Sequence, residues 1–182
     1  MRITETKIKG VYLIKPDIFN DERGIFVKPF NIDSFKKKGL ATNFEENFYS
    51  ISKKGVARGM HFQKPPNTMA KLVYVSEGSI LDIVLDVRKN SPTYRQHITI
   101  EISKKNHLAV YIPAGCAHGF FSLEDNSCTV YLQETVHSVN NEQGVNIQSL
   151  GLDLDISNLI ISERDKKLPS LKDFDSPFIN NQ

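Results

Sequence analysis

The sequence predicts an all-β protein, a β-sandwich or barrel with only short peripheral helices. Its 182 residues are 40% hydrophobic and 24% charged, which is the composition of a globular chain. Short runs of β-branched and aromatic residues recur every ~8–12 residues, with glycine or proline at the joints, as in antiparallel sandwiches and barrels. The length fits one domain over residues 1–182, of which roughly the last eight are expected to fray.

The expected elements follow one another along the chain. The first is a strand at Gly10–Ile14, and the second a strand at Phe26–Phe30. A brief helix is expected over 33–39, with Asp33 as its cap. Further strands are expected at 47–52, 60–63, 71–75, 79–87, 97–103, 108–112, 119–122 and 129–134. Beyond Asn140 the pattern weakens, and the tail from Lys166 is expected to follow the surface or to fray.

The clearest strand signal is "SILDIVLDV", residues 79–87. Every second residue from Leu81 to Val87 is apolar, so these side chains share one face of the strand. Asp82 and Asp86 fall on the other face among apolar residues. Two carboxylates there indicate either a solvated sheet edge or a polar cavity, and the sequence leaves both interpretations open.

Charge and cysteine content narrow the class of protein. A net charge of +2 gives no indication of nucleic acid or a membrane surface as partner. No apolar run approaches the ~18 residues of a membrane span, and the N-terminus lacks an apolar signal core. Cys116 and Cys128 form no CxxC motif. Two reduced thiols are expected, which fits a cytoplasmic protein.

The stretch "IPAGCAHGF" carries the motif PxGxxH, in which Pro113 and Gly115 form a tight turn before His118. This motif is typical of the second conserved segment of cupin barrels, which are double-sheet jelly rolls. A metal-binding cupin would add an HxH motif, but the chain has His61-Phe62-Gln63, and Lys71 stands where an acid is expected. An ammonium repels a divalent cation, so a metal is not expected.

Several further motifs stand in register with these, namely "DERGIF", "RGMHFQ", "KLVYVSEGSILDIVLDVRKNSPTY", "YLQETVHSVNNEQGV" and "ISERD". Together, over about residues 8–175, they resemble the dTDP-4-dehydrorhamnose 3,5-epimerase family. The resemblance implies a cofactor-free cupin, a double-stranded β-helix, that inverts C3, C5 or both of a nucleotide-linked 4-keto-6-deoxy sugar. The C4 ketone acidifies the neighbouring protons, so such a reaction needs a base, an enolate stabiliser and a second acid.

The resemblance implies a catalytic role for five residues. His61 matches the base, Asp165 its carboxylate partner, and Lys71 the cation near the ketone oxygen. Tyr131 matches a proton donor on the opposite face, and His118 lines the same cavity. Each alone has a structural explanation, such as a strand histidine, a surface lysine or a helix cap; only their joint order favours catalysis.

The resemblance also implies substrate contacts. Arg58 and Arg23 match arginines that hold the diphosphate, for which a planar guanidinium is suited. Gly59 would leave the ligand room, and Asp82 would orient Lys71 or His118. The other expected substrate-binding residues are Phe26, Lys28, Glu46, Gln63 and His137. The family forms homodimers in which N-terminal strands cross to the neighbour, so Arg23 is expected to serve the partner's site.

The chain departs from the family pattern where the family holds the base. Lys28 replaces a glutamate, Glu46 a glutamine and Phe48 an asparagine. Val136-His137 stands where a tyrosine usually stacks on the base. A carboxylate such as Glu46 prefers a base edge with several N–H donors, so CDP or GDP is predicted in place of dTDP.

Three other functions remain open. A sugar-nucleotide 3,4-ketoisomerase would use a similar enolate, a non-catalytic sugar-nucleotide-binding cupin would bind without proton exchange, and a metal-dependent cupin would carry a metal. The expected setting of the epimerase is the synthesis of a deoxysugar for a surface polysaccharide or a natural product.

Overall fold

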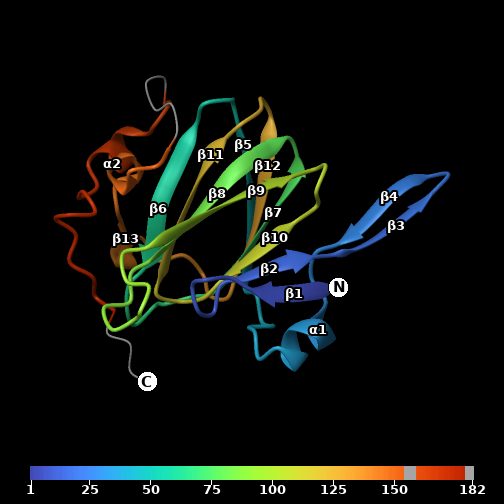
Figure 1. Ribbon diagram of the computed structural model, residues 1–182, viewed down its shortest axis with the longest axis horizontal. Coiled ribbons are helices and arrows are strands. Elements are labelled where there is room, and N and C mark those ends of the chain that lie inside the picture. The colour runs from blue at the N-terminus through green and yellow to red at the C-terminus, as the bar shows by residue number, and fades with distance from the viewer. Residues whose placement is uncertain (154–158, 179–182) are drawn as a thin grey trace.

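The computed structural model describes residues 1–153 and 159–178, and within them two antiparallel sheets face each other (Figure 1). The first sheet runs in the order β1 (Arg2–Glu5), β2 (Tyr12–Lys15), β10 (Ala109–Ile112), β7 (Lys71–Glu77), β12 (Ser127–Gln133), β5 (Glu46–Ser52). The second runs in the order β13 (Glu142–Gly144), β6 (Ala57–Gln63), β11 (Cys116–Ser122), β8 (Ser79–Asp86), β9 (His97–Ser103). This arrangement confirms the predicted all-β class and the jelly roll.

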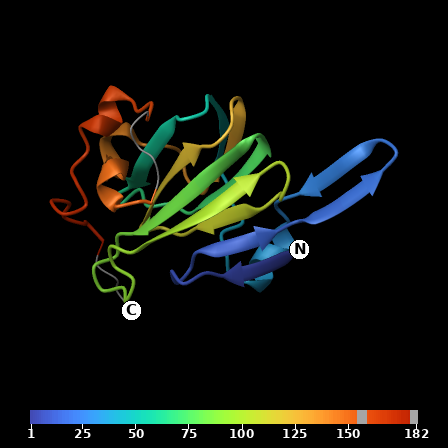
Figure 2. The same ribbon diagram turned by 45° about the horizontal axis from the view of Figure 1, so that its top comes forward.

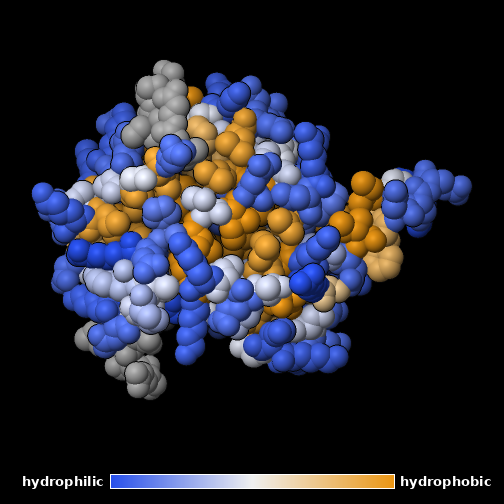
Figure 3. Space-filling model, viewed as in Figure 1, coloured by the Kyte–Doolittle hydropathy of each residue, from blue (hydrophilic) through white to orange (hydrophobic). Residues whose placement is uncertain are grey.

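A separate two-stranded hairpin, β3 (Asp17–Asp21) and β4 (Gly24–Lys28), projects away from the two sheets (Figures 1 and 2). It carries four exposed large apolar side chains, those of Ile18, Phe19, Ile25 and Phe26. The apolar surface at this hairpin is visible in Figure 3. Strand β3 was not predicted, because every residue in it is exposed and burial therefore leaves no alternating pattern to read.

The helical elements are short: α1 (Ile32–Lys37), α2 (Glu163–Lys166) and two 3₁₀ turns at Val139–Asn141 and Ile147–Leu150. No helix in the described part of the chain is long and apolar enough to cross a membrane. The predicted cap of α1 was wrong by two positions. Asn31 is the N-cap, because its side-chain oxygen accepts the Ser34 N–H at 3.0 Å, and Asp33 lies in the first turn.

Three apolar clusters hold the layers together. One lies between the sheets, and one lies between the first sheet and the α1 region, where Phe35 is fully buried. The third joins the outer face of the second sheet to the C-terminal segment, where Phe174 and Phe178 pack edge-on against Phe62 of β6. The predicted fraying was therefore wrong for residues 175–178, and residues 179–182 lie outside the described part.

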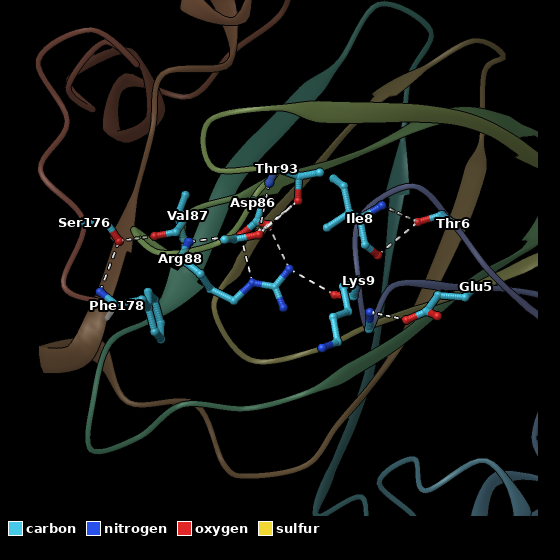
Figure 4. A network of polar contacts seen from close by, with 12 residues as sticks. Glu5, Thr6, Ile8, Lys9, Asp86, Val87, Arg88, Thr93, Ser176 and Phe178 are labelled. Atoms are coloured by element: carbon cyan, nitrogen blue, oxygen red, sulfur yellow. Dashed lines mark hydrogen bonds and ion pairs between the residues drawn. The ribbon is translucent and has the colours of Figure 1, made fainter. Parts of the chain in front are cut away.

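Asp82 and Asp86 are both fully buried, so the solvated sheet edge was the wrong interpretation. Asp86 sits in a polar cluster at the end of β8, where Arg88 Nε and Nη2 approach its two carboxylate oxygens at 2.8 Å (Figure 4). Ser91 and Thr93 also donate to this carboxylate. Burial raises the pKa of Asp86, but these hydrogen bonds outweigh it and lower that pKa below its ordinary value.

The same cluster connects distant segments of the chain. Arg88 Nη2 also donates to the Lys9 carbonyl at 3.0 Å, and Ser176 Oγ donates to the carbonyl of Val87 (Figure 4). The N-terminal loop, the end of β8 and the C-terminal segment therefore meet at one buried ion pair.

The chain has two Asp–Arg pairs with the same sequence spacing, one buried and one exposed, so the contribution of the buried pair to the free energy of unfolding can be measured against the exposed one. We expect Asp86→Ala to lower the free energy of unfolding by ~3 kcal/mol or more, because it leaves the Arg88 guanidinium largely buried without its carboxylate. The matched control is Asp21→Ala, which removes the partner of Arg23 on the exposed hairpin and should change stability little. Urea denaturation compares the two, and equal effects would contradict this account.

Candidate active site

A cavity of about 510 Å³ lies between the two sheets and is closed on one side by the C-terminal segment. All five side chains predicted to be catalytic line it. They come from five elements that are spread along the chain: β6, β7, β11, β12 and α2. Among the residues that the structure describes, no three or more histidine, cysteine and carboxylate side chains come together as a metal centre would require.

Asp165 and His61 form a hydrogen-bonded couple, with Asp165 Oδ1 at 2.9 Å from His61 Nε2. The other oxygen, Oδ2, accepts the backbone N–H of Gly59 at 3.1 Å. Ser162 caps α2 by accepting the backbone N–H of Asp165. Asp165 therefore lies in the first turn of this short helix, and its carboxylate points toward β6. Both carboxylate oxygens are thus fixed against the strand that carries His61.

This geometry sets the proton on the imidazole. A carboxylate only accepts hydrogen bonds, so Nε2 of His61 carries the hydrogen and Nδ1 keeps the lone pair. Burial raises the pKa of Asp165, but the hydrogen bond and electrostatic attraction from His61, the Gly59 N–H and the charge of Arg164 outweigh it and lower the pKa to about 2. Asp165 therefore remains ionised and orients the His61 imidazole.

Gly59 was expected to leave room for the ligand, and this explanation was wrong. Gly59 has a φ of +107°, and a Cβ there would lie 2.6 Å from the His118 carbonyl oxygen and 2.7 Å from Gly119 Cα. The space is occupied by the backbone of β11. Glycine is required because two neighbouring strands approach closely at this point.

Lys71 and Tyr131 face the cavity from the first sheet. Desolvation lowers the pKa of the Lys71 ammonium to about 8, against the opposing effect of the Glu142 carboxylate. The ammonium therefore stays mostly charged at neutral pH. Burial raises the pKa of the Tyr131 phenol, which keeps its proton and is available as an acid.

His118 and Asp82 form a second histidine–carboxylate couple, with Nε2 and Oδ2 2.6 Å apart. Both side chains are buried, and the His118 ring meets the Tyr131 ring edge-on at a centroid distance of 5.9 Å. Of the two partners expected for Asp82, the structure provides the contact with His118.

Among the residues expected to bind substrate, Arg58 lines the cavity and is held by its Nε–H, which donates to Ser52 Oγ at 3.2 Å. The hairpin residues Arg23, Phe26 and Lys28 do not line this cavity. The Arg23 side chain is 85% exposed and pairs with Asp21.

Glu46, Gln63 and His137 lie outside the cavity lining. The side chains of Glu46 and Gln63 instead bind backbone N–H groups of residues 137 and 138. Glu46 Oε2 accepts the His137 N–H at 3.2 Å, and Gln63 Oε1 accepts the Ser138 N–H at 3.1 Å. One oxygen of the Glu46 carboxylate is therefore engaged within the protein, which weakens the argument that this residue reads a base edge.

The model of the dTDP-4-dehydrorhamnose 3,5-epimerase family matches residues 5–173. The chain belongs to this family of carbohydrate epimerases. The namesake enzyme of Methanothermobacter thermautotrophicus is 34% identical over 177 residues, which cover 94% of this chain and 95% of that enzyme.

Solved structures of epimerases from this family are similar to this chain over nearly its full length. The Sulfolobus tokodaii dTDP-4-dehydrorhamnose 3,5-epimerase has a TM-score of 0.89 and 37% identity, covering 97% of this chain and 99% of that one. The dTDP-6-deoxy-D-glucose-3,5-epimerase of Legionella pneumophila, solved with dTDP-4-keto-L-rhamnose, has a TM-score of 0.89 and 30% identity, covering 96% and 94%.

The cavity also contains residues that the sequence analysis did not select. Arg164 donates to Glu142 Oε2 at 2.9 Å, and its Nη2 lies 3.1 Å from His61 Nε2. Because both groups at this second contact are donors, the guanidinium acts there through its charge rather than by a hydrogen bond. The signal was present in "SERD", where an arginine directly precedes Asp165. The other unselected lining residues are Phe48, Ser50, Val56, Ala57, Gln133, Ile160, Ile161 and Ser162.

The low pKa of Asp165 predicts how this epimerase responds to acid. A folded-state pKa of about 2, below the ordinary 3.8, stabilises the fold above about pH 4, and this contribution disappears as the pH falls through about 2. We expect wild type to lose ~2 kcal/mol more unfolding free energy across this range than Asp165→Asn. Urea denaturation at stepped pH measures it, and parallel curves for the two proteins would contradict the assignment.

Proposed function

We propose that this epimerase inverts C3, C5 or both of a nucleotide-linked 4-keto-6-deoxy sugar, by deprotonation and reprotonation through an enolate. The observation that carries the proposal is the placement of His61 and Tyr131. His61 stands on β6 of the second sheet and Tyr131 on β12 of the first, and both face one cavity. Inversion needs a base and an acid on opposite faces of a ring, and these two walls provide them.

His61 removes the proton through Nδ1, because Asp165 holds Nε2. As electrons move from the C–H bond toward C4, negative charge develops on the ketone oxygen. Lys71 offers a fixed ammonium for this charge, a kind of stabilisation that typically lowers a barrier by ~3–4 kcal/mol. Tyr131 then donates a proton to the carbon from the other side, and solvent restores both groups.

Arg58 and Arg164 supply the positive charge for a diphosphate near the base. Both line the cavity, and a guanidinium binds phosphate oxygens in a bidentate manner. The names of the relatives indicate dTDP as the nucleotide, and CDP or GDP, which the sequence pattern predicted, is the alternative. A 3,4-ketoisomerase and a non-catalytic binding protein would produce, respectively, a shifted carbonyl and no solvent exchange.

Heavy water distinguishes these possibilities. We expect wild type to incorporate deuterium at C3, C5 or both when given 4-keto-6-deoxy sugars linked to dTDP, CDP and GDP, with fastest exchange for the true nucleotide. His61→Ala should slow exchange ~10²–10⁴-fold, because the general base is lost. Tyr131→Phe should retain exchange on the His61 face but form less inverted product. Carbon-by-carbon NMR reads both results, and full-rate exchange by His61→Ala would reject the assigned base.

We further propose a cytoplasmic homodimer in which the β3–β4 hairpin reaches the neighbour's cavity. The exposed apolar side chains of the projecting hairpin support an interface (Figure 3), and the free thiols of Cys116 and Cys128 suit a reducing compartment. Arg23, Phe26 and Lys28 would then contact substrate in the partner's site, which explains why they lie away from their own.

Mixing two inactive variants tests the shared site. Arg23→Ala and His61→Ala chains, unfolded and refolded together, should regain about one quarter of wild-type activity, because half of the dimers are hybrids with one intact site each. Light scattering should give twice the chain mass of 20.6 kDa. A monomeric mass, or no recovery on mixing, would contradict the crossed hairpin.

A further inference from the structure

Two buried glutamines of this epimerase differ in one respect. Gln63 and Gln133 are each 5% exposed. The side-chain oxygen of Gln63 accepts the Ser138 N–H. The side-chain oxygen of Gln133 is buried without a hydrogen-bond partner among the described residues, although Gln133 lines the cavity. A buried acceptor without a hydrogen-bond partner destabilises the folded protein, so we expect a ligand to donate a hydrogen bond to it.

The sheet register places this acceptor beside the candidate enolate stabiliser. On β12, Gln133 stands directly opposite Lys71 of β7 on one side and Glu46 of β5 on the other. Side chains of directly opposed residues share a face, with their Cβ atoms ~5 Å apart. Lys71 and Gln133 both line the cavity, so their side chains enter it from adjacent positions on the same wall.

The next row of the wall is different in character. Tyr131, two residues along β12 and therefore ~7 Å from Gln133, stands opposite Phe48. The Phe48 ring stacks on the Tyr131 ring at a centroid distance of 4.7 Å and an angle of 15°, and it is 39% exposed. The wall thus offers a donor and an acceptor in one row and flat aromatic surface in the next.

The chemistry of the proposed substrate determines which of its groups can donate a hydrogen bond to the Gln133 oxygen. If Lys71 contacts the C4 carbonyl oxygen, the row beside it faces a substituent on an adjacent ring carbon. In a 4-keto-6-deoxy hexose, C5 carries a methyl group and C3 carries a hydroxyl. An amide oxygen accepts hydrogen bonds, and of these two substituents only the hydroxyl donates one.

We propose that Gln133 is a specificity-determining residue whose side-chain oxygen accepts a hydrogen bond from the C3 hydroxyl of the sugar, next to Lys71. This inference rests on the proposed function and adds the sugar class: the enzyme takes 4-keto sugars that retain the 3-hydroxyl and discriminates against 3-deoxy analogues. A site with a buried acceptor rejects a ligand that cannot satisfy it, because the acceptor then loses water without compensation.

Binding of two unreactive ligands tests the proposal. They are the 4-hydroxy-6-deoxyglucose nucleotide and its 3-deoxy counterpart, each linked to the nucleotide that gives the fastest exchange in heavy water. Without a ketone neither can be deprotonated, so calorimetry reads affinity alone. We expect wild type to prefer the 3-hydroxy ligand about tenfold, and Gln133→Leu to bind both ligands with the affinity that wild type has for the 3-deoxy one.

The outcomes separate the two proposals. Absence of exchange and of binding in wild type would reject the proposed function. Tight binding of both ligands with no preference, or a preference that survives in Gln133→Leu and in a second variant, Gln133→Met, would reject the role of Gln133 alone.

Gln63→Leu is the matched control for stability. It leaves the Ser138 N–H without its acceptor, so its midpoint of urea denaturation should fall below that of wild type. Gln133→Leu removes an acceptor that has no hydrogen-bond partner in the described part of the free protein, so its midpoint should stay at or above the wild-type value. If both variants lose stability equally, the Gln133 amide is bonded within the protein and the inference is wrong.

Discussion

The contact between the His61 imidazole and the Asp165 carboxylate joins the wall of the jelly roll to the segment that follows it, across 104 residues of sequence. A four-residue helix cannot hold a carboxylate in place by itself, because isolated helices of this length are unstable. Its position comes from the apolar cluster behind β6, where Phe174 and Phe178 pack on Phe62. The candidate base is therefore oriented by a core that lies on the far side of its own strand.

Strand β6 serves the site and the core at once. Successive side chains of a strand point to opposite faces, so His61 faces the cavity while Met60 and Phe62 enter the outer apolar cluster. The same alternation on β12 directs Thr129, Tyr131 and Gln133 inward. A substitution that changes packing on the outer face would consequently move a reacting group on the inner face, since interiors are densely packed and transmit strain.

The cavity combines cations with fixed anions. Lys71, Arg58 and Arg164 line it, while Asp165 and Glu142 hold the base and Arg164 respectively. Such groups are already oriented before a ligand arrives, and preorganised charge in a partly desolvated site stabilises a developing enolate better than water does. The aromatic pair beside them excludes water from the phenol, so one wall offers both charge and apolar surface.

The local sequence determined much of this protein. Period-two alternation marked the central strands and turn residues marked their ends. The spaced motifs indicated the family and six of the residues that line the cavity: Arg58, His61, Lys71, His118, Tyr131 and Asp165. Short or exposed elements, β1, β3, β13 and α2, were missed, because they gain their structure from neighbours rather than from their own pattern. The final residues up to Phe178 were expected to fray, because the local sequence does not show that Phe174 and Phe178 pack against the distant Phe62.

Only the tertiary structure decided which polar groups meet. It buried Asp86 against Arg88, brought Arg164 next to His61, and packed the backbone of β11 against Gly59. It also left the Gln133 oxygen without a hydrogen-bond partner among the described residues. The physical reason is that a periodic pattern specifies the face on which a side chain lies, whereas its hydrogen-bond partner depends on strand register and on packing between segments far apart in sequence.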